Sequence, residues 1–256
     1  WFAAVCRRRM FVVARFVAAA TVAIAGVVVV DARHTTTDLL PLHPSAAQIR
    51  SLAIDRLLAV RGSAVLHHNR RAFLSTVDPR SPAFRRSQSQ MFENLAALHF
   101  ASWSYALTSI ERRSPPDAAR YGDPVWAPKT FTLNFRLAHF DDRPTNLRQY
   151  PTFVERHGQW YLASLSDYSS SGLVSATDLW DYGPVSVVRR SDVLVLGAAP
   201  QRAAMLKVAS DVQVALPQVT SVWGSGWARR VVVLLDQLDH RVPGEGAVVA
   251  LSVPRA

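Results

Sequence analysis

The longest run of apolar positions lies near the amino terminus. Residues 11–30 are mostly apolar and contain Arg15 as their only charge, and three arginines precede them at positions 7–9. As a helix, a segment of this length spans about 30 Å, the thickness of the hydrocarbon core of a bilayer. Because arginines before a membrane helix favour the cytoplasmic side, the amino terminus is expected inside and everything after residue 31 outside.

We interpret residues 1–30 as a short cytoplasmic segment followed by an uncleaved, membrane-spanning signal anchor. A cleaved secretory signal and a buried core helix are the alternatives. The residues around Asp31 lack the small-residue pattern of a cleavage site, and no cysteine follows the apolar run to carry a lipid. The chain begins with Trp1, and Met10 is a candidate start of the reading frame.

The pattern after the anchor predicts a tether and then a helix. Residues 34–44 form a short, polar segment rich in threonine, which is the composition of a tether, and we assign the tether to residues 31–44. Ser45 and Gln48 have the spacing of a capping box, which predicts a helix start. Apolar residues then recur at steps of three and four, and Gly62 is expected to break or bend this helix. The expected buried positions are Ile49, Leu52, Ala53, Leu57, Val60 and Ala64.

Two further helical stretches are predicted before residue 100. The first ends at residues 74–77, and Asp-Pro and Ser-Pro pairs within residues 78–82 mark a turn. In the second, Phe92, Leu95 and Leu98 form one apolar stripe. The positions expected away from that stripe are Gln88, Glu93 and Asn94.

The period of the pattern changes to two after residue 100. Apolar and polar residues alternate over residues 102–108 and 131–139, as in strands with one buried face. His157 and Gly158 separate two further apolar runs and predict a hairpin. Helices followed by an antiparallel sheet predict an α+β domain over residues 45–165.

A second, smaller segment is predicted towards the carboxyl terminus. Residues 166–184 are rich in turn-forming residues and are interpreted as a linker. A strand pattern at 186–197, a helical pattern at 203–216 and an apolar run at 231–235 follow. They predict a β-α-β unit within an incomplete α/β segment, residues 185–256, which is too short to bury a large core alone.

The charge and cysteine content of the chain argue against two classes of protein, nucleic-acid-binding proteins and disulfide-rich scaffolds. The net charge is +10, but four arginines and no acid lie in the first thirty residues, so the remaining excess is thinly spread. A nucleic-acid-binding groove is therefore not expected. Cys6 is the only cysteine, which excludes a disulfide scaffold.

No catalytic residue, metal ligand or cofactor is assigned from motifs. The sequence contains no glycine-rich phosphate loop, no G-x-S-x-G elbow and no H-E-x-x-H helix. The adjacent His67 and His68 point apart on a helix, so a solvated face is favoured over a metal pair. His139 with Asp141 and Asp142 could hold a cation, although turn chemistry explains the two aspartates equally well. A metal site is likewise disfavoured for the carboxyl-terminal set Asp239, His240 and Glu245.

A ligand cavity is the remaining possibility for a site. Flat aromatic rings supply contact area with few rotatable bonds, so aromatic residues on the predicted strands could line a pocket. Most of these rings are expected to be core. The candidate cavity-lining residues are Trp103, Tyr105, Phe131, Phe135, Trp160 and Tyr161.

Two resemblances sharpen these expectations. The order of elements, ending in the hairpin at 153–165, resembles the NTF2-like cone fold, which implies helices packed on a curved antiparallel sheet with a cavity between them. Motifs at 90–98, 179–184 and 219–233 resemble actinobacterial membrane-anchored proteins in which an NTF2-like region precedes a gluzincin-type, peptidase MA-like zinc metallopeptidase domain. The likeness covers roughly residues 46–235. That family's chemistry needs H-E-x-x-H, which this chain lacks, so the chain resembles the N-terminal part only.

The sequence therefore predicts a membrane-anchored extracytoplasmic protein with a non-catalytic binding or accessory role. Its expected partners are the membrane, through the N-terminal helix, and a cell-surface protein or small-molecule ligand. One alternative is a truncated fragment of a membrane-tethered zinc metallopeptidase, because the family pattern is lost after about residue 238. Another is an NTF2-like domain that binds or hydrolyses a small molecule in its cavity.

Overall fold

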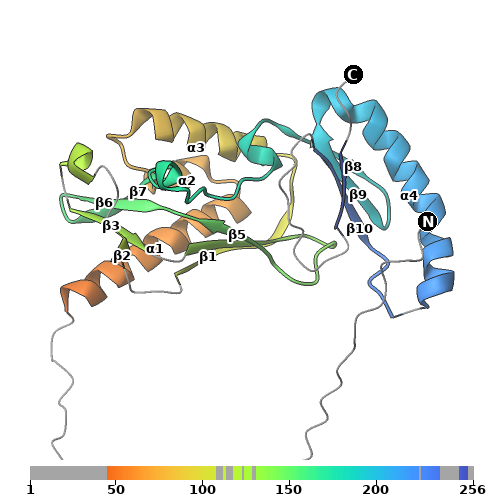
Figure 1. The fold of residues 1–256 in the computed structure, drawn as a ribbon, viewed down its shortest axis with the longest axis horizontal. Helices are drawn as coiled ribbons and strands as arrows, with labels where there is room; N and C mark the ends of the chain where they lie inside the picture. Colours follow the sequence, from red (N-terminus) through yellow and green to blue (C-terminus); the bar gives the residue numbers. More distant parts are fainter. Residues whose placement is uncertain are drawn as a thin grey trace, which may run out of the picture. The chain divides into compact units, whose positions relative to one another are not determined.

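The structure is a computed structural model, and it describes only part of the chain (Figure 1). The described residues are 45–107, 112–113, 118–122, 124–128, 131–224, 226–236 and 248–252. The predicted anchor and tether lie outside these ranges, as do Asp239, His240 and Glu245. Within the described ranges, no helix has the length and apolar character needed to cross a bilayer.

Three helices open the described chain: α1 (Ala46–Leu66), α2 (Arg70–Ser75) and α3 (Pro82–Asn94). The predicted start of the first helix is confirmed. The Ser45 side chain accepts a hydrogen bond from the Gln48 backbone N–H at 3.3 Å, and the Gln48 side chain accepts one from the Ser45 N–H at 2.7 Å. This reciprocal pair satisfies donors that the first turn of a helix leaves unpaired.

The buried face of α1 differs from the prediction. Ile49, Leu52 and Val60 were expected in the core, but they are 55%, 52% and 45% exposed. Apolar residues surround this helix on all sides, so their spacing is compatible with more than one buried face. Packing selects a face that includes one arginine. Its buried residues are Ile54, Leu57, Leu58, Arg61, Gly62, Ala64 and Val65.

Gly62 does not interrupt α1, contrary to the prediction. A Cβ atom at this position would lie 2.7 Å from the backbone oxygen of Trp103 in β1 (Phe100–Leu107). The absence of a side chain therefore allows the strand to approach the helix closely.

We expect Gly62→Ala to lower the free energy of unfolding by about 1–3 kcal/mol, the usual cost of overpacking, although alanine has the better helix propensity. Urea denaturation followed by tryptophan fluorescence measures the change. Ser63→Ala, at the exposed neighbouring position, is the matched control and is expected to stay within about 0.5 kcal/mol of the parent. A Gly62→Ala midpoint equal to that of the control would show that the close approach is not constraining.

The predicted α+β class is confirmed, because two antiparallel sheets follow the helices. The first has the strand order β1-β4-β5 and the second the order β2-β3-β6-β7. Their bounds are β2 (Arg112–Arg113), β3 (Val125–Pro128), β4 (Phe131–Leu137), β5 (Thr145–Gln149), β6 (Thr152–Arg156) and β7 (Gln159–Ser164).

The predicted hairpin joins β6 to β7. His157 and Gly158 have φ angles of 52° and 78°. Two consecutive residues with positive φ form the turn whose twist matches that of the flanking strands. The turn brings the end of β6 and the start of β7 into antiparallel register, with Arg156 opposite Gln159.

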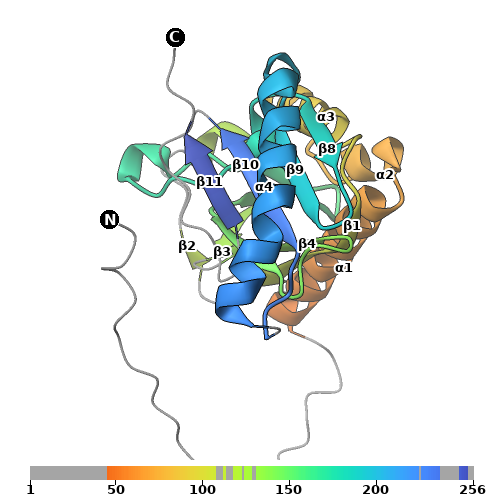
Figure 2. The same cartoon turned by 90° about the vertical axis from the view of Figure 1, so that its right-hand side faces the viewer.

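A third sheet contains the predicted β-α-β unit, but the strand predicted at 186–197 is instead two antiparallel strands, β8 and β9. Its order is β11-β10-β9-β8, with β8 antiparallel to β9 and the other pairs parallel. The helix α4 (Arg202–Trp223) connects β9 to β10 and lies across one face of this sheet (Figure 2). Met205 and Ala209 are fully buried on that face. The strands are β8 (Val185–Arg189), β9 (Val193–Ala198), β10 (Val231–Asp236) and β11 (Val248–Ser252).

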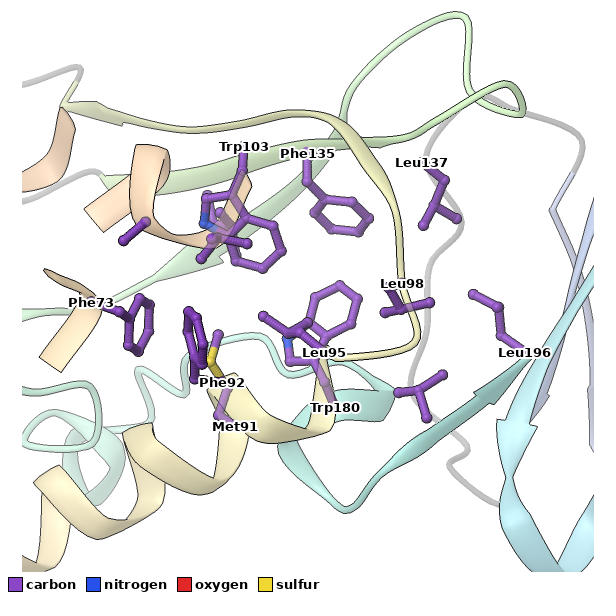
Figure 3. Close-up of a cluster of buried hydrophobic side chains, with 14 of the residues drawn as sticks. Phe73, Met91, Phe92, Leu95, Leu98, Trp103, Phe135, Leu137, Trp180 and Leu196 are labelled. Carbon is purple, nitrogen blue, oxygen red and sulfur yellow. The ribbon is translucent and has the colours of Figure 1, made fainter. Parts of the chain in front are cut away.

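The largest hydrophobic cluster includes residues on both sides of the predicted linker. Trp180, from the stretch expected to be a linker, is only 2% exposed. Its ring centroid lies 5.6 Å from that of Trp103 and 5.1 Å from that of Phe135 (Figure 3). Leu196 of β9 belongs to the same cluster. Residues 166–184 therefore contribute to a shared core, and the described residues from Ser45 onward belong to one compact unit.

Two polar residues of α3 are buried, contrary to their expected place away from the apolar stripe. Asn94 is 3% exposed, and its side-chain amide donates to the backbone oxygen of Trp180 at 2.7 Å. Gln88 is 6% exposed and accepts a hydrogen bond from Arg61. Their burial is compatible with stability because each has a hydrogen-bond partner.

Candidate functional site

A pocket of about 820 Å³ opens beside the start of α3. Its walls come from the turn before α3, the short 3₁₀ helix Ala118–Tyr121, the end of β6 and the end of β7. Among the described residues, the lining includes no carboxylate. We call this site the arginine pocket, and its charged and hydroxyl side chains include Arg80, Arg120, Arg156, Ser81, Ser164 and Ser166.

Arg156 is held at the base of the pocket by a buried carboxylate. Its Nε and Nη2 atoms donate to the two oxygens of Asp78 at 3.2 and 2.9 Å. Its Nη1 atom donates to the backbone oxygen of Tyr121 at 2.7 Å. The side chains of Arg156 and Asp78 are 6% and 0% exposed, so the guanidinium is fixed in one orientation.

The charge of Asp78 is maintained by hydrogen bonds. Burial of the carboxyl group works to raise its pKa, but the donors around it outweigh that effect and lower the pKa. Besides Arg156, the backbone N–H of Arg80 and the hydroxyl of Ser81 both donate to it at 3.0 Å. Asp78 is therefore ionised at neutral pH and is not a source of protons.

A second carboxylate, Asp167, orders the rim of the pocket. It accepts hydrogen bonds from the Tyr121 and Thr152 hydroxyls, both at 2.7 Å, and it forms an ion pair with Arg120. The Asp167 side chain is 4% exposed, whereas that of Arg120 is 48% exposed. Burial, followed by the hydrogen bond to Asp167, raises the pKa of Tyr121 to about 12, so its phenol stays protonated.

Arginine and serine side chains make up most of the polar lining of the pocket. Asp78 and Asp167 each accept several hydrogen bonds, and Tyr121 holds its proton. The described lining residues include no histidine or cysteine. Arginine and serine side chains lie around the space, and such donors bind carboxylate and phosphate groups.

A further buried arginine lies in the core, away from the pocket lining. Arg61 is 2% exposed and donates to Tyr105 Oη at 3.0 Å, to Thr76 Oγ1 at 3.2 Å and to the side chain of Gln88. Its guanidinium carbon lies 3.8 Å from the ring centroid of Phe73. All of these partners are neutral, and burial lowers the pKa of Arg61. The side chain links helices α1, α2 and α3 to strand β1.

The six aromatic residues predicted to line a cavity are distributed over three packing clusters, two of which Tyr105 contacts, and the lining of the arginine pocket includes none of the six. Trp103 stacks on Phe135 with ring centroids 5.8 Å apart. Tyr105 stacks on Phe131 at 5.5 Å. The other two, Trp160 and Tyr161, lie on β7, where Trp160 packs in the cluster of Phe131 and Tyr161 packs beside Tyr121.

The histidines considered as metal ligands lie at a helix end and in a turn, where local backbone contacts account for their positions. His67 and His68 are exposed at the end of α1, where the Nδ1 atom of His67 lies 2.8 Å from the backbone oxygen of Ser63. His139 adopts a φ of 70° in the turn after β4, and Asp141 accepts the Leu137 N–H at 2.7 Å within that turn. In the described part of the chain, no cluster of three histidine, cysteine, aspartate or glutamate residues has the arrangement of a metal site.

Comparison of the chain with models of protein families, with curated proteins and with solved structures finds no match. Residue roles are therefore assigned from the geometry of this chain. The NTF2-like and metallopeptidase resemblances stay predictions.

Proposed function

We propose that this chain is a membrane-anchored, extracytoplasmic binding protein without catalytic activity, and that it binds an anionic ligand in the arginine pocket. The observation that carries the proposal is the distribution of charge in the pocket. Arg80, Arg120 and Arg156 line it, whereas Asp78 and Asp167, the partners of Arg156 and Arg120, are not among the described lining residues. A ligand entering the pocket thus meets cations and hydroxyl groups.

The pocket also has an apolar wall, which favours an organic anion over a bare inorganic ion. Pro82, Ala83, Phe84 and Ala163 contribute to its lining. Its volume falls in the range of roughly 300–1,000 Å³ that is usual for small-molecule sites. A small molecule with a carboxylate or phosphate group and an aliphatic or aromatic body matches both surfaces.

The anchored and extracytoplasmic parts of the proposal rest on residues 11–30 and the arginines before them. The NTF2-like part is supported by the order of elements, in which α1, α2 and α3 precede two antiparallel sheets. A fold of that kind hosts many functions, so the pocket rather than the fold identifies the ligand class.

Phenyl phosphate is a suitable probe for this pocket, and calorimetric titration is expected to show that it binds more tightly than inorganic phosphate or phenol. Arg120→Gln removes an exposed cation at the rim and is expected to weaken binding about tenfold or more, the effect of losing one charge-assisted hydrogen bond. Arg71→Gln is the matched control, because Arg71 is exposed on α2 and is not in the lining. Equal affinity for phenol and phenyl phosphate would contradict an anion site.

The absence of catalysis needs its own test. Incubation of the full chain with p-nitrophenyl phosphate and p-nitrophenyl acetate is expected to release nitrophenol at the uncatalysed rate. Release that is abolished by Arg120→Gln but not by Arg71→Gln would favour the hydrolytic alternative. The metallopeptidase-fragment alternative predicts an in-frame H-E-x-x-H in the genomic sequence downstream, which resequencing of the locus tests.

A further inference from the structure

We infer that one exposed face of α1 rests on the bilayer surface, against anionic phospholipid; this inference depends on the proposed anchor. Positions three or four residues apart along α1 are exposed and mostly apolar. Ile49 and Leu52 are more than half exposed, and Val60 is 45% exposed. We call this surface the outer face of α1, and it comprises Ile49, Leu52, Arg56, Ala59 and Val60.

The position of α1 in the chain keeps this face near the membrane. The tether at residues 31–44 separates the proposed anchor from the helix start at Ser45. Fourteen residues reach at most about 50 Å even when fully extended. Ile49 and Leu52 lie within the first two turns of α1, directly after the tether. Such tethering makes a weak surface contact effective, because the anchor supplies the high local concentration.

The size of the outer face fits a lipid surface better than a second copy of the chain. It is one helix wide, about 10 Å, and positions 49–60 extend over about 18 Å of helix, which gives roughly 180 Å². A stable dimer usually buries about 800 Å² on each partner. The outer face alone falls well below that area, whereas an interfacial helix needs only a shallow apolar contact.

The charge on the outer face also favours a lipid surface over a second copy of the chain. Arg56 lies in its middle and is exposed, and Asp55 lies at its border. In a two-fold symmetric contact, the Arg56 side chains of both copies would be brought together. Against a bilayer, the same side chain can extend its aliphatic stem along the apolar surface and place its charge among lipid phosphates.

The test uses the full chain in vesicles of phosphatidylcholine and phosphatidylglycerol. Cys6→Ser removes the native thiol, and Leu52→Cys or Val60→Cys then carries an environment-sensitive fluorophore. Ala204→Cys, exposed on α4, is the matched control. Flotation measures attachment, while brominated lipids and aqueous iodide quench labels that contact lipid and water, respectively.

We expect the protein to float with the vesicles, and the labels at positions 52 and 60 to be quenched by brominated lipid and not by iodide. The label at 204 is expected to show the reverse. Flotation with iodide quenching at 52 and 60 would overturn the inference while leaving the anchor intact. Protection of these labels from both quenchers would show that a second copy covers the face. Failure to float would remove the anchor, and the inference would fall with it.

Discussion

Asp78→Ala is expected to lower the free energy of unfolding by about 3–5 kcal/mol, because it leaves a buried guanidinium without its carboxylate. Arg156 is only 6% exposed, so water replaces poorly the two hydrogen bonds that Asp78 accepts from it. The Arg80 N–H and the Ser81 hydroxyl lose an acceptor in the same step. Urea denaturation at pH 7, followed by far-ultraviolet circular dichroism, measures the loss.

The matched control is the double variant Asp78→Ala/Arg156→Met, which removes the unpaired charge and retains an apolar stem. Replacement of a whole buried ion pair is far less costly than removal of one partner, so the double variant is expected to recover most of the lost stability. A double variant as unstable as Asp78→Ala would show that the lost carboxylate volume and its other hydrogen bonds dominate.

Acid titration of stability provides a second readout for the same pair. The pKa of Asp78 is lower in the folded protein than its ordinary value near 3.9, so folding favours the ionised form. Its contribution is complete above the unfolded-state pKa and is lost as the pH falls through the folded-state pKa. The urea midpoint of the parent is therefore expected to fall more steeply below about pH 4 than that of the double variant.

Local patterns along the chain were sufficient to predict most elements. The capping box at Ser45 and Gln48 marks the start of α1, and His157-Gly158 marks the hairpin. Both depend on interactions within a few residues, which the sequence displays directly. The buried face of α1 depends on what packs against the helix, and an apolar surface on all sides does not specify it.

The arginine pocket could not be predicted because its pairs are far apart in sequence. Asp78 and Arg156 are separated by 78 positions, and Asp167 lies 47 positions from Arg120. Asp78 looks like an ordinary Asp-Pro turn residue, and Arg156 ends a strand whose other residues are mostly buried. Only the arrangement of the strands reveals that each charge has a partner.

The burial of Trp180 within residues 166–184 could not be predicted for a related reason. Turn-forming residues dominate residues 166–184, and this composition is typical of an exposed segment. One large aromatic residue within it, Trp180, packs against rings of β1 and β4 and thereby joins the segment to the core. Leu196 and Leu234 of the third sheet belong to the same cluster. The average composition of a segment does not predict that one of its side chains, here Trp180, is buried in the core.

Trp180→Ala is therefore expected to lower the free energy of unfolding by about 3–5 kcal/mol, the cost of removing a fully buried tryptophan. Its ring contacts those of Phe100, Trp103 and Phe135, so the cavity would open where the sheets share their core. Tyr182→Ala, 61% exposed in the same segment, is the matched control and is expected to change stability by less than about 1 kcal/mol. Circular dichroism in urea should show one cooperative transition for the parent and both variants. Two separate transitions in the parent, with Trp180→Ala no less stable than Tyr182→Ala, would instead restore residues 166–184 as a linker between independent units.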